Sequence, residues 1–227
     1  MSAVRRQPRT AAPRPELIVA RDWVSAALLV IGDAQPRTWA LAGGSTPRAL
    51  YERLPSLDLP WADVECFFGD ERCVPPVHPA SNYGMAAGYL AALPVRVHPM
   101  PGISGDAAAY ERLLRDRLGP RPALDLALLG LGEDGHTASL FPGDPALEER
   151  TRLVARVHRP DFDRLTLTLP MLSAAKLALF LVTGAAKREA LRALLAGGPI
   201  PAARVHAQRV VVIADLEAGA GIEGDAP

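Results

Sequence analysis

The sequence predicts an α/β protein with a mainly parallel, doubly wound sheet and helices on both faces, a Rossmann-like arrangement. Short apolar runs alternate along the chain with helix-like segments, which is the order that builds a parallel sheet. Several runs are apolar at nearly every position, as in strands that are covered on both faces. Glycine-rich or charged loops follow three of the runs directly, where such sheets bind ligands.

The expected strands are the apolar runs of four to seven residues. They cover residues 38–42, 64–68, 95–98, 124–129, 165–169, 177–183 and 210–214. The expected helices lie between them, with apolar residues at helical spacing. They cover residues 16–31, 47–54, 82–90, 105–118 and 185–196.

The length of 227 residues is that of one domain, which we expect over residues 16–218. Residues 1–15 are rich in arginine and proline, so we expect a disordered basic tail there. Residues 219–227 are rich in glycine and alanine, so we expect a flexible C-terminus.

Composition excludes several classes of protein. The 25 basic and 25 acidic residues cancel, so no global field attracts the chain to nucleic acid or to a membrane surface. Its two cysteines cannot build a disulfide framework, and no Cys/His spacing is typical of a metal site. No apolar run approaches the ~20 residues that span a bilayer. We therefore expect a cytoplasmic protein without a metal site.

The first loop of interest follows the expected strand 38–42 and contains Gly43, Gly44, Ser45 and Thr46 before Pro47. The glycines permit a close backbone approach to a ligand, and Ser45 or Thr46 can cap a helix that has Pro47 in its first position. Free N–H groups at that helix start would bind an anion. An ordinary strand-to-helix turn explains the same residues. The motif is neither a nucleotide-triphosphate loop nor a nucleophile elbow.

The second loop follows the strand 64–68 with three consecutive charges, of which Asp70 and Arg72 are the candidate site residues. A guanidinium group matches phosphate bidentately, so we expect Arg72 on an anionic substrate. Asp70 would accept hydrogen bonds from hydroxyl groups or orient a neighbour, and the amide of Asn82 could assist. The alternative is a self-neutralising surface turn.

The third loop, residues 130–142, contains a formal G-x-G-x-x-G pattern. Pro142, Gly143 and Pro145 end any following helix after about one turn, which argues against a dinucleotide site. The glycines instead present His136 at the start of a short helix. A histidine with a pKa near ~6.5 can take and return a proton at neutral pH.

Two later cations complete the candidate site. Arg164 immediately precedes the expected strand 165–169, and Lys187 follows the strand 177–183. Each alone fits a solvated surface charge, but with Arg72 they would form a cationic pocket at one sheet edge.

Five motifs occur in order: LAGGSTPRALYERL, GDERCVPPVHPASNYG, LDLALLGLGEDGHTASLFPG, RLTLTLP and LVTGAAK. Together the motifs resemble the lactonase branch of the glucosamine-6-phosphate isomerase/6-phosphogluconolactonase family, over roughly residues 16–216. The resemblance implies hydrolysis of 6-phospho-D-glucono-1,5-lactone, with His136 as general base and Asp70 near the reacting end. It also implies a phosphate held by Arg72, Arg164 and Lys187, a sugar phosphate as partner and no cofactor. We expect a monomer or weak homodimer.

Three other functions remain open. Deaminases of the same family carry a glutamate five residues after the histidine, where this chain has Phe141, and usually an aromatic residue where it has Arg72. A non-catalytic sugar-phosphate sensor would keep the pocket without using His136 as a base. A serine hydrolase would use Ser139, three residues after His136, as its nucleophile.

Overall fold

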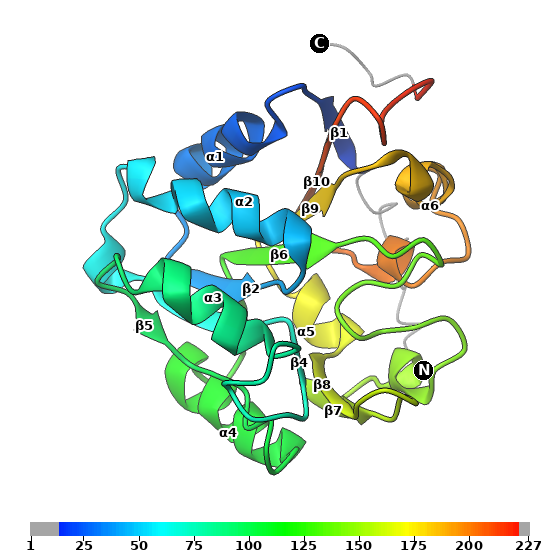
Figure 1. The fold of residues 1–227 in the computed structure, drawn as a ribbon. Coiled ribbons are helices and arrows are strands. Elements are labelled where there is room, and N and C mark those ends of the chain that lie inside the picture. Colours follow the sequence, from blue (N-terminus) through cyan, green and yellow to red (C-terminus); the bar gives the residue numbers. More distant parts are fainter. Residues whose placement is uncertain (1–13, 223–227) are drawn as a thin grey trace, which may run out of the picture.

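The computed structural model describes residues 14–222, so the predictions for residues 1–13 and 223–227 lie outside the described part. The described chain forms a seven-stranded parallel sheet, a small antiparallel sheet and flanking helices (Figure 1). The α/β class and the parallel sheet are therefore as the sequence predicts. Among the described residues, no helix is both long and apolar enough to cross a bilayer.

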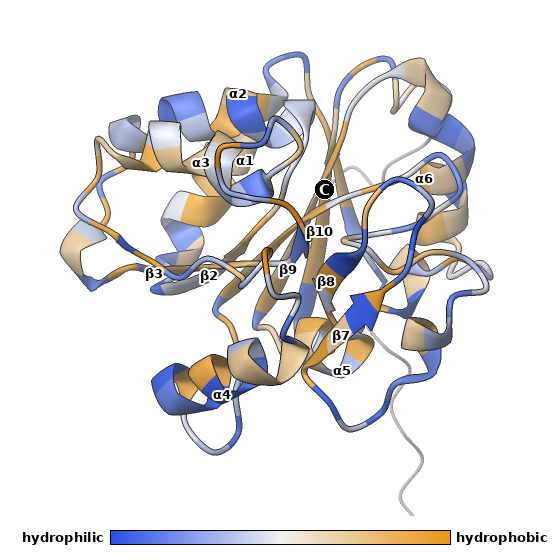
Figure 2. Cartoon of the chain, turned by 60° about the horizontal axis from the view of Figure 1, so that its bottom comes forward, coloured by the Kyte–Doolittle hydropathy of each residue, from blue (hydrophilic) through white to orange (hydrophobic). Residues whose placement is uncertain are grey.

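The large sheet has the strand order β1-β10-β9-β6-β2-β3-β5, and each neighbouring pair is parallel. Its strands are β1 (Glu16–Val19), β10 (Arg209–Ala214), β9 (Leu177–Val182), β6 (Leu126–Gly130), β2 (Thr38–Leu41), β3 (Glu65–Phe68) and β5 (Arg96–Val97). Every residue of β9 is buried, as expected for a central strand with helices on both faces. The strands at the centre of Figure 2 are accordingly mostly hydrophobic.

The helices divide between the two faces of this sheet. On one face lie α1 (Trp23–Ala34), α2 (Ser45–Arg53) and α3 (Asn82–Leu90), and on the other α4 (Ala107–Leu118), α5 (Leu169–Ser173) and α6 (Arg188–Leu195) (Figure 2). Short 3₁₀ segments cover η1 (Leu54–Ser56), η2 (Trp61–Asp63), η3 (Pro145–Glu148), η4 (Ala185–Lys187) and η5 (Ala202–Arg204). Connections between parallel strands are right-handed. The chain runs across the sheet from β1 to β5 and then returns through β6, β9 and β10, so the helices of the two passages lie on opposite faces.

This reversal creates a crevice between β2 and β6, which are neighbours in the sheet. After β2 the chain passes to β3 on one side, and after β6 it passes to β9 on the other. The loops that leave the carboxyl ends of β2 and β6 therefore separate. This topological switch point is where open α/β sheets bind their ligands.

A second sheet, which the sequence analysis missed, consists of β4 (Asp70–Arg72), β8 (Arg164–Leu167) and β7 (Val154–Val157). Its pairs are antiparallel. The chain changes sheet at Gly69, whose N–H donates to Leu41 of β2 and whose carbonyl accepts from Leu167, the last residue of β8. The charged segment after β3 is thus a strand, not the predicted loop.

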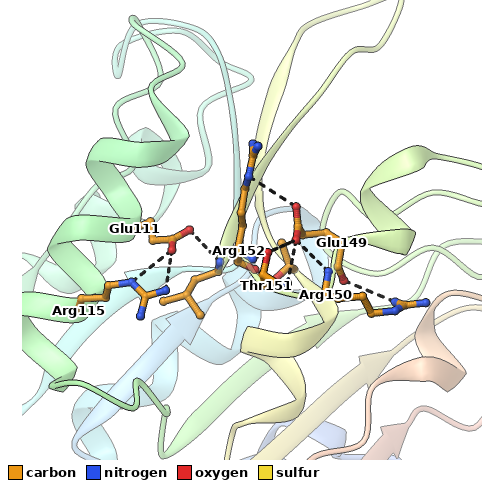
Figure 3. A network of polar contacts seen from close by, with 8 residues as sticks. Glu111, Arg115, Glu149, Arg150, Thr151 and Arg152 are labelled. Carbon is orange, nitrogen blue, oxygen red and sulfur yellow. Dashed lines mark hydrogen bonds and ion pairs between the residues drawn. The ribbon is translucent and has the colours of Figure 1, made fainter.

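Carboxylates tie this second sheet to α4 and to its own approach segment. Glu111 of α4 accepts from the N–H of Leu153, at the start of β7, and from Arg115. Glu149 accepts hydrogen bonds from the backbone N–H groups of Arg150, Thr151 and Arg152 (Figure 3). The path of the chain into β7 is therefore fixed by hydrogen bonds.

Two predicted elements need correction. The predicted helix 16–31 begins with strand β1, because its apolar residues pair with β10, which is almost two hundred residues away in the chain. Asp22 then caps α1, its carboxylate accepting from the N–H of Ser25 at 3.0 Å. The predicted strand 165–169 ends at Leu167, and Leu169 already begins α5. Long-range pairing overrides local propensity at β1. At the end of β8 the signal is local, since Pro170 lies in the first turn of α5.

Candidate active site

The crevice at the switch point contains a cavity of about 250 Å³. Nine of its lining residues are those that the sequence analysis selected. They are Gly43, Gly44, Ser45, Thr46, Asp70, Arg72, His136, Arg164 and Lys187. The structure thus brings together residues from α2, β4, β8, η4 and the loop after β6.

Strand alternation explains the three consecutive charges of β4. Asp70 and Arg72 share one face of the strand and line the cavity, whereas Glu71 points to the other face. There the buried Glu71 carboxylate accepts from the backbone N–H groups of Asn82 and Tyr83, at the start of α3. One of the three charges therefore has a structural role, and the other two face the cavity.

Asn82 joins this group from α3. Its amide nitrogen donates to the Oδ1 atom of Asp70 at 3.0 Å, and its amide oxygen accepts from Arg72 at 2.9 Å. Asn82 fits there only because Gly43 has no side chain. A Cβ atom on Gly43 would lie 1.8 Å from the Asn82 amide oxygen.

His136 is oriented by Asp134, a residue that the sequence analysis did not select. The Oδ1 atom of Asp134 lies 2.6 Å from Nδ1 of His136 and also accepts from the His136 backbone N–H. Because a carboxylate accepts, the proton of the neutral ring is assigned to Nδ1, and Nε2 is left as the basic nitrogen. Gly132 leaves room for the ring, since a Cβ atom there would lie 2.0 Å from Nδ1.

The segment after His136 is a series of turns, not the predicted short helix. Phe141 returns to the site, and its ring centroid lies 4.6 Å from that of His136. The guanidinium groups of Arg159 and Arg164 lie 4.1 and 5.3 Å from the same ring centroid. An apolar ring thus separates the histidine from two cations.

Two guanidinium groups offer unused donors to a ligand. The Nε atoms of Arg72 and Arg164 are buried and lack a hydrogen-bond partner within residues 14–222. Buried donors are rarely left unpaired in folded proteins. Both residues line the cavity, so an anion placed there would satisfy donors that are otherwise unpaired.

The start of α2 forms another part of the cavity wall. Gly44, with a φ of +100°, precedes the helix, and no side chain caps it. The helix begins at Ser45, two residues before the predicted start at Pro47, and neither Ser45 nor Thr46 serves as the cap. The Thr46 hydroxyl instead contacts that of Thr183 at 2.8 Å. The first N–H groups of α2 are therefore open to an anion.

Lys187 approaches the same cavity from η4, beyond the carboxyl end of β9. Its Nζ atom lies 3.7 Å from Oε1 of Glu133. The Lys187 side chain is 28% exposed and that of Glu133 is 68% exposed, so water screens this pair. A phosphate group would compete with Glu133 for the lysine.

Sequence reasoning selected neither Thr183 nor Asp134. Thr183 directly follows β9 at the carboxyl edge of the sheet, a position that marks ligand-facing residues in this architecture. Asp134 stands two residues before His136, a spacing that suits a turn. Within the described residues, no group of histidine, cysteine and acidic side chains has the arrangement of a metal site.

The fold and the cavity define an α/β protein with an oriented histidine and a cationic binding site. The family model described as "Glucosamine-6-phosphate isomerases/6-phosphogluconolactonase" matches residues 17–213. A 6-phosphogluconolactonase of Synechocystis sp. is 44% identical over 70% of this chain and 71% of its own length. The human 6-phosphogluconolactonase is 36% identical over 73% of this chain and 72% of its own length.

A solved structure agrees with these relatives. The 6-phosphogluconolactonase from Trypanosoma brucei superposes with a TM-score of 0.83 at 28% identity, covering 92% of this chain and 99% of its own. The chain belongs to the glucosamine-6-phosphate isomerase/6-phosphogluconolactonase family. Within that family it is similar to members named 6-phosphogluconolactonase, so the predicted family is confirmed.

Proposed function

We propose that this chain hydrolyses 6-phospho-D-glucono-1,5-lactone to 6-phospho-D-gluconate, with His136 as the general base. The lactonase name of its relatives supports the reaction. The observation that carries the mechanism is the 2.6 Å contact between Asp134 and Nδ1 of His136, which leaves Nε2 free beside a cationic cavity.

In the first step, a water molecule attacks C1 of the lactone while Nε2 of His136 takes one of its protons. The carbonyl becomes a tetrahedral oxyanion, and His136 becomes an imidazolium beside the Asp134 carboxylate. When the intermediate collapses, the bond from C1 to the ring oxygen breaks, and the imidazolium returns its proton to that oxygen. General acid–base catalysis of this kind contributes about 10²–10⁴ in rate.

Asp70 orients the reacting groups in this mechanism. Its carboxylate lines the cavity and is only 7% exposed, while Asn82 holds one of its oxygens. A carboxylate oxygen accepts hydrogen bonds, so Asp70 can bind a sugar hydroxyl or the attacking water. A reactant that is held in this way needs less reorganisation to reach the transition state.

The phosphate group binds far from C1, at a cationic wall of the cavity that consists of Arg72, Arg164, Lys187 and the start of α2. The open N–H groups of α2 and the ammonium of Lys187 bind this group, and Arg164 and Arg72 contribute their unpaired Nε donors. This binding energy positions the lactone carbonyl beside His136.

Phe141 favours this reaction over a deaminase reaction. The resemblance places a catalytic glutamate of the deaminases at its position, but here an aromatic ring is packed against His136. Phe141 is 6% exposed and cannot move a proton.

The test is lactone hydrolysis above the spontaneous rate, measured for the wild type and two variants. His136→Ala is expected to lower kcat by about 10²–10⁴ with little change in KM, because it removes the base. Lys187→Met is expected to raise KM by about tenfold or more, because it removes a phosphate contact, while kcat falls less.

Near-normal turnover by a folded His136→Ala variant would contradict the proposed base. Equal lactone loss with and without wild-type protein would contradict the proposed reaction. That second result would leave a sugar-phosphate sensor, which calorimetry with 6-phosphogluconate would detect as binding without turnover.

A further inference from the structure

Ser139 connects the loop that carries His136 to the strand that carries Asp70. Its side chain is fully buried, and its hydroxyl donates to the Oδ2 atom of Asp70 at 2.5 Å. Its backbone N–H donates to the Thr166 hydroxyl at 3.2 Å, and Thr166 is the residue of β8 that pairs with Asp70. The contact therefore joins two segments that are sixty-nine residues apart in the chain.

The Asp70 carboxylate is held at both of its oxygens. Ser139 donates to Oδ2, and Asn82 donates to Oδ1 at 3.0 Å. Two donors in different directions fix the plane of the carboxylate, whereas one would leave it free to rotate. The orientation of Asp70 in the cavity thus depends on Ser139 as much as on Asn82.

The backbone turn beside Ser139 supports this contact. Ala138 adopts a φ of +48°, in the left-handed region that favours glycine. Residues Thr137 and Leu140 pair across this turn as an isolated bridge. The turn directs the Ser139 side chain to Asp70, while His136, three residues earlier, stays on the cavity wall. A strained residue at such a position is typical of a functional site.

We propose that Ser139 is a positioning residue, which fixes the Asp70 carboxylate relative to His136 for the attack on the lactone. This inference rests on the proposed function, since it acts through Asp70 and His136. It assigns Ser139 a role other than that of a nucleophile. The Ser139 hydroxyl is buried and hydrogen-bonded to Asp70, not to His136. The His136 Nδ1 atom is hydrogen-bonded to Asp134.

A double-mutant cycle tests this role with Ser139→Ala, Asp70→Asn and the double variant. Ser139→Ala is expected to lower kcat by about 10- to 100-fold, the size of effect that a misplaced catalytic group produces, with KM within about threefold of the wild type. Because Ser139 acts through Asp70, the double variant is expected to match Asp70→Asn alone. Contacting residues that act as one unit give such non-additive effects.

Thr137→Val is the matched control. Thr137 is also fully buried in the same loop, but its hydroxyl donates to the Gly130 carbonyl at 2.9 Å instead of to Asp70. Any loss of kcat in this variant reports disturbance of the loop. In combination with Asp70→Asn, that loss is expected to multiply with the Asp70→Asn loss instead of disappearing.

Multiplying losses for Ser139→Ala and Asp70→Asn would overturn the inference, as would unchanged kcat in Ser139→Ala. A fall of Ser139→Ala to the spontaneous rate, with a covalent acyl-enzyme in the wild type, would indicate a nucleophile and also overturn it. Full activity of Asp70→Asn would instead contradict the proposed role of Asp70. If Ser139→Ala does not fold, Ser139→Cys, which is similar in volume and a weak donor, enters the same cycle.

Discussion

Asp134 determines which ring nitrogen of His136 is left without a partner from this turn. Partial burial opposes its ionisation, but hydrogen bonds from the backbone N–H and the ring of His136 outweigh that effect and lower the pKa of Asp134. The carboxylate is therefore ionised at neutral pH. In the proposed mechanism it would stabilise both the tautomer with a free Nε2 and the imidazolium that forms.

Asp134→Asn is expected to lower kcat by about 10- to 100-fold, because an amide that donates to Nδ1 favours the wrong tautomer. KM is expected to change little, since Asp134 does not belong to the cationic wall. Steady-state lactone hydrolysis measures both constants. Asp144→Asn is the control, because Asp144 only caps η3. Equal losses in the two variants would contradict the orienting role.

Among the helices, α3 has a first turn that is held by two side-chain acceptors. Ser81 caps it by accepting from the N–H of Gly84, and Glu71 accepts from the N–H groups of Asn82 and Tyr83. This anchoring holds Asn82 against Asp70 and Arg72. Two glycines in the same helix differ sharply in what surrounds them.

Gly88→Ala is expected to stabilise the protein by about 0.5–1 kcal/mol, because alanine has the higher helix propensity and its Cβ would meet no atom within 4 Å. Gly84→Ala is expected to destabilise it, because that Cβ would lie 2.0 Å from the Pro76 carbonyl oxygen. Urea unfolding of both variants measures the difference. The same sign of change at both positions would be inconsistent with this packing.

At the scale of the whole molecule, Asp125 ties three central strands together at the sheet edge opposite the cavity. It directly precedes β6 and accepts from the backbone N–H groups of Arg37 and Thr38, where β2 begins, and from Lys176 beside β9. Burial opposes its ionisation, but these hydrogen bonds outweigh burial and lower the pKa of Asp125.

A pKa that is lower in the folded state than in the unfolded state stabilises the folded protein at pH values above the unfolded pKa, which is about 4. That stability is lost as the pH falls through the folded pKa. Asp125→Asn is therefore expected to destabilise the protein by about 1–2 kcal/mol at pH 7. The difference should shrink below about pH 4. Urea unfolding of both proteins at several pH values measures it, and a constant difference down to pH 2 would rule out this linkage.

The parallel sheet and the residues of the candidate site could be predicted from the sequence alone. Fully apolar runs such as that of β9 indicate burial on both faces, and residues that follow such runs reach the carboxyl edge of the sheet. The nine selected residues accordingly line one cavity. For the residues that follow β2, β6 and β9, adjacency in space follows from a general property of parallel sheets. Arg164 instead reaches the cavity through the antiparallel pairing of β8 with β4.

The opposite directions of the β4 charges and the direction of the Ser139 side chain depend on tertiary contacts. Asp70 and Arg72 face the cavity, while Glu71 anchors α3, because β4 pairs with β8, almost a hundred residues later. The same pairing brings Thr166 and Asp70 to Ser139. Local sequence cannot specify such contacts, because their free energy arises from segments that are distant in the chain and meet only in the folded protein.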